Sequence, residues 1–165
     1  MSDTPTSDQP LHTHEDSVEI GAPPDAVWGL VTAMDRYGEW SSENCGGYWR
    51  KNAEGVVGTG EVGDFFVGVN RLGDQEWKAP VEIVERDENR AFAFVTGGLA
   101  YNIARWRYVL EPTAQGTRLS EQYELRTLSP LMKENGQPEI DQRMLNMRTS
   151  IRATLLGLKA AAAAL

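Results

Sequence analysis

The chain has 165 residues and a mass of 18.3 kDa, a length typical of one domain with a substantial core. Its hydrophobic content of 41% and charged content of 24% are ordinary for a globular protein. The net charge of −8 argues against a nucleic-acid partner, whose binding surface would be basic. The single cysteine, Cys45, excludes an internal disulfide and a multi-thiolate zinc site.

The N-terminal stretch MSDTPTSDQP is acidic and has no apolar run, so it does not resemble a secretory signal peptide. No other run reaches the length that a membrane span needs. We therefore expect a cytoplasmic protein with no membrane insertion, either a monomer or a homodimer. Residues 1–14 contain too few apolar side chains to fold alone. They are predicted to form a disordered or mobile tail, and residues 15–165 a single domain.

The segment after the tail predicts one strand and two short helices. Val18 and Ile20 alternate with polar residues in SVEIGA, which indicates a short half-buried strand. In APPDAVWGLVTAMDRYGEW, Pro24 suits a first helical turn, and apolar residues then recur at helical spacing. A second short helix or turn is expected at residues 35–40.

Between residues 46 and 126 the pattern changes to period two, with glycine and asparagine between the runs. The six candidate strands are GYWRK, DFFVGVNRL, EWKAPVEIVER, RAFAFVT, ARWRYVLEP and TRLSEQYELRT. The links DENR and EPTAQGT have the composition of hairpin turns. Pro80, inside the EWKAPVEIVER strand, predicts an edge position or a bulge there.

The C-terminal part predicts a loop, LSPLMKENGQPE, and then one long amphipathic helix over residues 140–165. The apolar stripe of this helix contains Ile140, Met144, Met147, Ile151, Leu155 and Leu158. An antiparallel meander cannot bury its inner face without a partner, and only this helix is long enough to cover it. The predicted fold is therefore α+β: a curved antiparallel sheet of about seven strands around a long C-terminal helix. The two short helices after the first strand would close one end.

This order of elements resembles the helix-grip fold of the START-like (SRPBCC) superfamily. The stretches that carry the resemblance are APPDAVWGLVTAMDRYGEWSSE, FVGVNRLGDQEW, RWRYVLEP and GTRLSEQYE. Over about residues 15–160 the chain is most similar to the polyketide cyclase/dehydrase and lipid-transport branch. Members of the superfamily bind lipids, aromatic polyketides, hormones or alkaloids, and only some catalyse a reaction. The resemblance thus implies a hydrophobic ligand but does not separate a carrier from an enzyme.

Strand parity selects the residues that would line such a cavity. Glu121 shares one face of its strand with Leu119, Tyr123 and Leu125. The predicted concave face is rich in large aromatic residues, with Asn70, Glu121 and the Tyr123 hydroxyl as its polar groups, and small-molecule pockets have this composition. The predicted ligand-binding residues are Trp40, Glu43, Trp49, Phe66, Asn70, Trp77, Phe94, Trp106, Tyr108, Glu121, Tyr123, Met144 and Met147. Glu121 and Tyr123 are also the catalytic candidates.

A structural interpretation of Glu121 remains open beside the functional one. A buried carboxylate needs a partner, and Arg148 or Arg152 of the predicted C-terminal helix would supply a guanidinium. In that case Glu121 would be half of a buried ion pair and would need no ligand. One residue can also serve both purposes.

Three further features are weighed and set aside. GTGEVG satisfies a dinucleotide-binding pattern, but a strand follows it where that pattern needs a helix, so a hairpin is favoured. The same loop resembles the glycine-rich loop of the birch pollen allergen branch, which is a flexible pocket flap there. His12 and His14 lie in the polar tail without a clear third ligand, so no metal is predicted. Cys45 has no histidine near it in sequence. No cofactor is expected.

The sequence supports three hypotheses for function. In the first, the protein is a carrier or sensor that binds a hydrophobic small molecule (aromatic, polyketide-like or lipid) in an internal cavity. In the second, it is a polyketide cyclase, aromatase or dehydratase, with Glu121 as base and tyrosine hydroxyls orienting an enolate oxygen. In the third, it is a protein–protein interaction module, which would need an exposed apolar patch and little internal volume.

Overall fold

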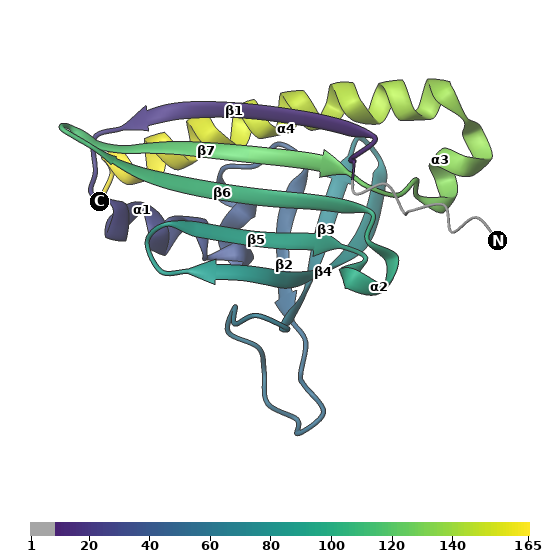
Figure 1. The fold of residues 1–165 in the computed structure, drawn as a ribbon. Coiled ribbons are helices and arrows are strands. Elements are labelled where there is room, and N and C mark those ends of the chain that lie inside the picture. Colours follow the sequence, from purple (N-terminus) through teal and green to yellow (C-terminus); the bar gives the residue numbers. More distant parts are fainter. Residues whose placement is uncertain (1–8) are drawn as a thin grey trace.

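The computed structural model describes residues 9–165, which form one curved sheet and several helices (Figure 1). The expectation of a mobile N-terminal tail falls largely on residues 1–8, which lie outside the described residues. The strands are β1 (His12–Ile20), β2 (Asn44–Trp49), β3 (Phe65–Leu72), β4 (Gln75–Asp87), β5 (Ala91–Thr96), β6 (Ala104–Thr113) and β7 (Gly116–Leu125). The helices are α1 (Pro24–Val31), η1 (Met34–Glu39), α2 (Gly98–Tyr101), α3 (Pro130–Asn135) and α4 (Gln137–Ala163).

The seven strands form a single antiparallel sheet in the order β1-β7-β6-β5-β4-β3-β2. Each strand from β2 to β7 pairs with its neighbour in sequence, and β1 completes the sheet by pairing with β7. Asp16 lies opposite Glu121 in the β1–β7 register, and Tyr108 lies opposite Glu121 in the β6–β7 register. These two pairings fix what surrounds the Glu121 side chain, because directly opposed residues on a sheet point to the same face.

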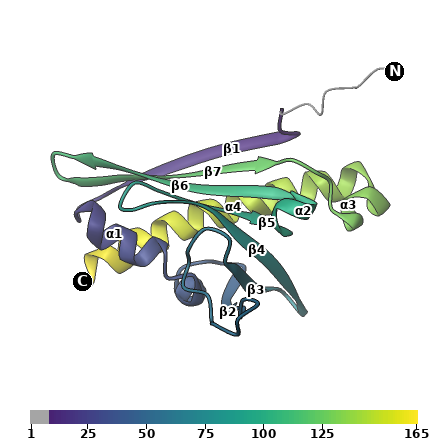
Figure 2. The same ribbon diagram turned by 60° about the horizontal axis from the view of Figure 1, so that its bottom comes forward.

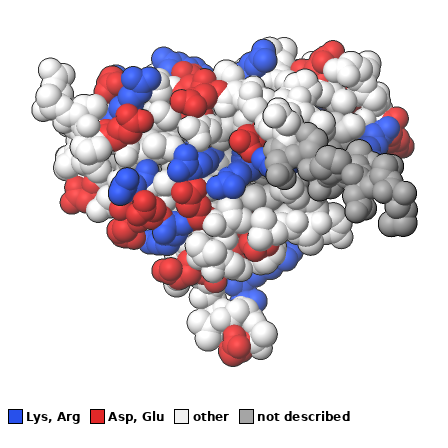
Figure 3. Space-filling model, in the orientation of Figure 1, with Lys and Arg blue, Asp and Glu red and all other residues white. Residues whose placement is uncertain are grey.

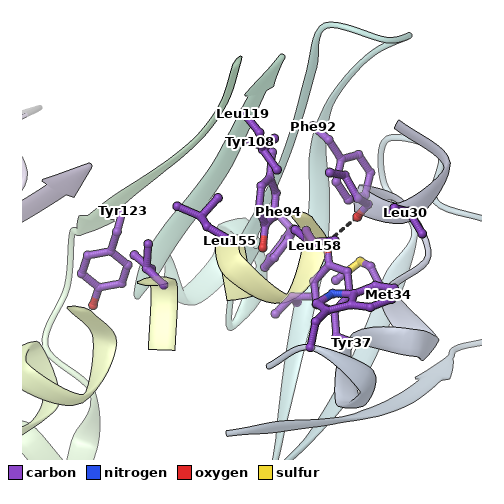
Figure 4. Packing of buried hydrophobic residues seen from close by; sticks show 14 of the residues in the cluster. Leu30, Met34, Tyr37, Phe92, Phe94, Tyr108, Leu119, Tyr123, Leu155 and Leu158 are labelled. Atoms are coloured by element: carbon purple, nitrogen blue, oxygen red, sulfur yellow. Dashed lines mark hydrogen bonds between the residues drawn. The ribbon is translucent and has the colours of Figure 1, made fainter. Parts of the chain in front are cut away.

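The concave face of the sheet is covered by α4, as the helical stripe predicts. Figure 2 shows α4 running alongside β7 and β6, with its C-terminal end beside α1. All six residues of the predicted stripe are buried, and Leu155 and Leu158 are 0% exposed. In Figure 4, Phe94 and Tyr108 lie beside these two leucines, with Met34 and Tyr37 of η1 on the other side. The prediction of an α+β helix-grip fold is confirmed.

Two local predictions differ from the structure. The segment predicted as the loop LSPLMKENGQPE contains the helix α3. Ser129 caps it by accepting a hydrogen bond from the Met132 backbone N–H at 3.3 Å, and Pro130 supplies the fixed backbone angle of a first turn. Strand β1 begins at His12, earlier than the SVEIGA pattern indicates, because residues 12–16 pair with β7 along its length although their composition is polar.

Pro80 was predicted at a sheet edge or a bulge, but it lies in β4, an interior strand, opposite Val67 of β3. The register shift in β4 falls later, between Ile83 and Glu85. The Pro80 carbonyl oxygen accepts a hydrogen bond from the Gly97 N–H at 2.8 Å. The Pro80 nitrogen therefore points to the same side of β4 as this oxygen, where β5 has just ended. The prediction was wrong because an interior strand tolerates a proline where its neighbour stops.

The outer surface is charged, with both signs mixed. Figure 3 shows Lys and Arg side chains interspersed with Asp and Glu on one face of the molecule. Several of these charges are paired: Arg107 donates to Glu85 at 2.8 Å, and Arg105 lies 3.3 Å from the same carboxylate. The hydrogen bond from Arg107 lowers the pKa of Glu85. A long loop over residues 50–64 extends from this body between β2 and β3 (Figure 1).

At Gly157, α4 lies very close to Trp40. A Cβ atom at this position would lie 2.7 Å from the Trp40 carbonyl oxygen and 2.8 Å from its Cα, closer than real side chains come. Trp40 itself is only 6% exposed, so its backbone has little space to move. Glycine weakens a helix in isolation, but here it is required for α4 to pack against Trp40.

We predict opposite effects of alanine at two helical glycines. Gly157→Ala should destabilise the fold by about 1–3 kcal/mol, since the added methyl group overpacks the contact with Trp40. Gly29→Ala, in α1, should be neutral or stabilise by up to about 1 kcal/mol, because nothing lies within 4 Å of its Cβ position. Urea unfolding of both variants measures the difference. Equal changes in both would show that Gly157 acts through helix propensity alone.

Candidate functional site

Two adjoining pockets lie between α4 and the concave face of the sheet. The inner pocket has a volume of about 120 Å³, and the outer pocket about 460 Å³. Both are lined by Glu43, Ala79, Thr96 and Trp106, which therefore form the boundary between them. The inner pocket is further lined by Met34, Tyr37, Ser41, Asn44, Phe66, Gly68, Asn70, Val81, Phe94, Tyr108, Glu121, Ser150 and Thr154.

Glu121 lines the inner pocket and is only 3% exposed. Burial raises the pKa of its carboxyl to about 8, because the charged form loses its hydration. Hydrogen bonding from the Tyr108 hydroxyl lowers this pKa, and the Asp16 carboxylate raises it. Its Oε1 atom is buried without a hydrogen-bond partner. At neutral pH, therefore, Glu121 is predominantly an uncharged carboxylic acid, with hydrogen-bonding capacity directed at a pocket.

The structure does not pair Glu121 with either arginine considered for it. Arg152 lies 3.5 Å from Asp16, and it also donates to the Ser17 carbonyl oxygen at 3.3 Å. Arg148 is exposed. Within residues 9–165, Glu121 forms no ion pair, so the ion-pair interpretation was wrong. The reason is geometric. The pairing of β1 with β7 places Asp16 beside Glu121, and the Arg152 guanidinium pairs with Asp16 instead.

Two tyrosines stand beside Glu121 in the inner pocket. The Tyr37 hydroxyl donates to the Val31 carbonyl oxygen, which fixes the ring, and its ring centroid lies 6.3 Å from that of Tyr108. Burial raises the pKa of both hydroxyls, and the nearby Glu121 carboxyl raises both further. Both phenols are therefore protonated throughout the neutral range. With Ser150 and Thr154 on the helix side, they give the inner pocket a set of uncharged polar groups.

The boundary between the two pockets is held by polar contacts. Arg143 of α4 lies 3.4 Å from Glu43, and its guanidinium stacks over the Trp77 ring at 5.2 Å. The Trp106 indole N–H donates to the Thr96 hydroxyl at 3.1 Å. Glu43 and Trp106 line both pockets, so these contacts hold the side chains at the boundary between them.

Most residues predicted to bind a ligand line these pockets. The inner one contains Glu43, Phe66, Asn70, Phe94, Trp106, Tyr108 and Glu121. The outer one contains Glu43, Trp77, Trp106, Tyr123 and Met147. Trp40, Trp49 and Met144 line neither pocket: Trp40 is covered by α4 at Gly157, Met144 is buried in the core, and Trp49 packs edge-on against Phe66 at 5.0 Å. Their role as ligand contacts is not supported by this geometry.

The two catalytic candidates face different pockets. Tyr123 lies on the same face of β7 as Glu121, as parity predicts, but it lines the outer pocket and its ring packs against Trp106 at 4.7 Å. Burial raises the pKa of Tyr123 to about 12, and the nearby Arg143 lowers it. Figure 4 shows Tyr123 set apart from the Tyr108 and Tyr37 side chains. The phenol beside Glu121 is therefore Tyr108.

Several lining residues are absent from the sequence predictions. Thr154 and Ser150 lie on the sheet-facing side of α4, among the apolar positions of the stripe. Polar residues on an otherwise apolar stripe are a signal that could have found them. Tyr37 and Arg143 had no comparable signal, because their positions depend on how η1 and the start of α4 pack.

The features set aside in the sequence lie away from both pockets. His12 and His14 are in β1, and Cys45 is exposed. None of the glycines of GTGEVG lines either pocket. Among residues 9–165 there is no group of three His, Cys, Asp or Glu side chains suited to a metal ion. In the same part of the chain, no helix combines the length and apolarity that crossing a membrane requires.

A seven-stranded antiparallel sheet that grips one long helix over an internal pocket is the helix-grip fold of the START-like superfamily. Residues 12–163 match the family described as "Polyketide cyclase / dehydrase and lipid transport", and the chain belongs to this family. Among curated proteins none matches the chain.

Solved structures of similar proteins share this fold. The Polyketide_cyc-like protein Cgl2372 from Corynebacterium glutamicum is 29% identical, with a TM-score of 0.61 over 89% of this chain and 88% of that one. TTHA0849 from Thermus thermophilus is 16% identical, with a TM-score of 0.70 over 93% and 98%. The di-domain ARO/CYC protein StfQ from the steffimycin biosynthetic pathway is 13% identical, with a TM-score of 0.66 over 90% of this chain and 49% of that one.

We predict that Glu121 makes stability fall as pH rises. Its pKa is about 8 in the fold and about 4.5 when unfolded, so between these values the unfolded chain releases a proton that the folded chain keeps. The stability lost between about pH 5 and about pH 8 should be on the order of a few kcal/mol. Glu121→Gln, which cannot titrate, should remove this part of the slope in urea unfolding.

Glu124→Gln is the matched control, because it is the same substitution on the same strand, at a position that faces the other side of the sheet. Its stability should follow the pH dependence of the parent protein. Parallel curves for the parent and Glu121→Gln would mean that Glu121 is ionised in the folded protein.

Proposed function

We propose that the protein binds a hydrophobic small molecule in the two adjoining pockets and acts as its carrier or sensor. The observation that carries this proposal is the continuous wall shared by the pockets. Trp106, Ala79 and Thr96 border both, so a ligand that occupies the two spaces would contact these three residues. Apolar walls with few polar groups are typical of small-molecule sites.

The composition of the outer pocket supports a hydrophobic ligand. Its walls include Trp77, Pro80, Ile103, Leu125, Met132 and Met147. Methionine side chains adapt to irregular shapes, and aromatic rings offer large contact areas. The interior volume also distinguishes this proposal from a protein–protein module, for which little internal space would be expected.

We predict that truncating Trp106 weakens ligand binding. Trp106→Ala removes the aromatic wall between the pockets, so the neutral fluorescent probe N-phenylnaphthylamine should bind about tenfold more weakly. Trp49→Ala is the matched control, because Trp49 is also half-buried but lines neither pocket. It should bind the probe as the parent does. A folded Trp106→Ala variant with unchanged affinity would contradict the proposal.

A second candidate function is an enzyme of the cyclase, aromatase or dehydratase type. The observation that favours it is the placement of Glu121 and the Tyr108 hydroxyl together in the inner pocket, with the pKa of Glu121 at about 8. A group with a pKa near neutral can both give and accept protons at working pH. Belonging to a family described by cyclases and dehydrases, and the fold shared with an ARO/CYC protein, add support.

We predict that such an enzyme would exchange protons beside a bound carbonyl group. Acetylnaphthalene in deuterated water would lose its methyl proton signals in NMR spectra faster with the protein than with buffer. Glu121→Gln should abolish the increase, typically a loss of about 10²–10⁴-fold for a general acid–base group. Binding without any increase in exchange would favour the carrier.

A further inference from the structure

Among residues 9–165, Glu121 is the residue that both lines the inner or the outer pocket and has a buried side-chain oxygen without a hydrogen-bond partner. Three buried side-chain polar atoms in residues 9–165 lack a partner: Oε1 of Glu121 and the indole N–H groups of Trp28 and Trp40. Neither tryptophan lines the inner or the outer pocket, whereas Glu121 lines the inner one. Leaving a buried polar group unpaired costs free energy, so a partner supplied by a ligand would be favourable there.

The charged groups around Glu121 do not prepare the site for an anion. Asp16 faces it from β1 and carries the same charge, while Tyr37 of η1 and Tyr108 of β6 are phenols. From α4 the pocket receives the hydroxyl groups of Ser150 and Thr154.

The cations that α4 carries nearby are already engaged. Arg152 pairs with Asp16, and Arg143 pairs with Glu43 at the boundary. An anionic ligand group beside Glu121 would therefore lack a free counter-charge from these residues, and its desolvation would go uncompensated. A neutral carbonyl or hydroxyl group carries no such cost.

The two pockets differ in volume, and this difference divides a ligand into a smaller and a larger part. The inner pocket, about 120 Å³, has polar side chains on several sides, including Asn70, Glu121 and Thr154. The outer pocket, about 460 Å³, offers mainly apolar walls, such as Trp77, Ile103 and Met132. A small polar group fits the first and a larger apolar body fits the second.

We propose that the ligand is an uncharged molecule with two parts, a small head bearing a carbonyl or hydroxyl oxygen that hydrogen-bonds to Glu121, and a larger apolar body in the outer pocket. The proposal rests on the proposed function and adds the chemistry of the head. A protonated Glu121 offers an O–H donor and an acceptor oxygen, and thus suits either a carbonyl or a hydroxyl group.

The test uses four probes of similar shape that differ in the head group: naphthalene, acetylnaphthalene, naphthoate and naphthylmethylamine. Binding is measured by calorimetry at about pH 6 and about pH 9, on either side of the Glu121 transition. At the lower pH, acetylnaphthalene should bind about fivefold to tenfold more tightly than naphthalene, the usual gain from one neutral hydrogen bond. Naphthoate should bind more weakly than naphthalene. At the higher pH the preference for acetylnaphthalene should fall, since ionised Glu121 no longer donates.

Three variants separate the role of Glu121 from a general effect of the pocket. Glu121→Gln keeps a donor and an acceptor, so the preference for acetylnaphthalene should persist at both pH values. Glu121→Leu removes both groups, so acetylnaphthalene and naphthalene should bind alike. Glu124→Gln, the same substitution on the opposite face of β7, should behave as the parent.

The outcomes that overturn the inference differ from those that overturn the proposed function. Equal binding of naphthalene and acetylnaphthalene by the parent would leave a hydrophobic pocket without the proposed head recognition. Tightest binding of naphthylmethylamine, lost in Glu121→Gln, would show that Glu121 serves as a carboxylate for a cation. If Glu121→Leu keeps the preference, another residue recognises the head. No binding of any probe would overturn both proposals.

Discussion

One helix has to cover the concave face of a seven-stranded sheet, and most of the structure follows from that constraint. The stripe of α4 is apolar and buried along its length, yet a single helix is only about 10 Å wide with its side chains. It cannot fill the whole width of a curved sheet. Where large strand residues complete the packing, the interior is solid. Where the helix presents Ser150 and Thr154, space remains and becomes the inner pocket.

The inner pocket that α4 leaves open contains a buried acid, Glu121. A carboxyl group inside an apolar core would normally need a cation, yet Glu121 has none in the described chain. The fold avoids a buried charge because the group keeps its proton, and the Tyr108 hydroxyl beside it offers a hydrogen bond. Ionisation of Glu121 in the folded protein costs free energy, so stability alone does not explain a glutamate at this position. Its retention in a pocket wall is consistent with a functional use.

Local patterns were sufficient for the fold and for much of the site. Alternation in β3, β6 and β7 placed Phe66, Trp106 and Glu121 on the concave face, because side-chain direction in a strand follows directly from parity. Parity could not tell the inner pocket from the outer one, so Tyr123 was grouped with Glu121. It also could not reveal that Asp16 takes Arg152, since that depends on the pairing of β1 with β7, the most distant strands in sequence. Trp40, predicted as a ligand contact, lines neither pocket, and its close contact with α4 leaves no trace in hydrophobic spacing.

Because of the contact at Gly157, positions along α4 differ in the substitutions that they tolerate. At Gly157 any side chain would collide with Trp40, so this position is closed to substitution. Ser150, about two turns earlier on the same face, borders an open pocket and is only half-buried. Mutations at Ser150 can reshape the site while the contact between Gly157 and Trp40 holds the helix in place. Relatives with the same fold could therefore diverge in ligand preference through one stretch of the helix without losing the architecture.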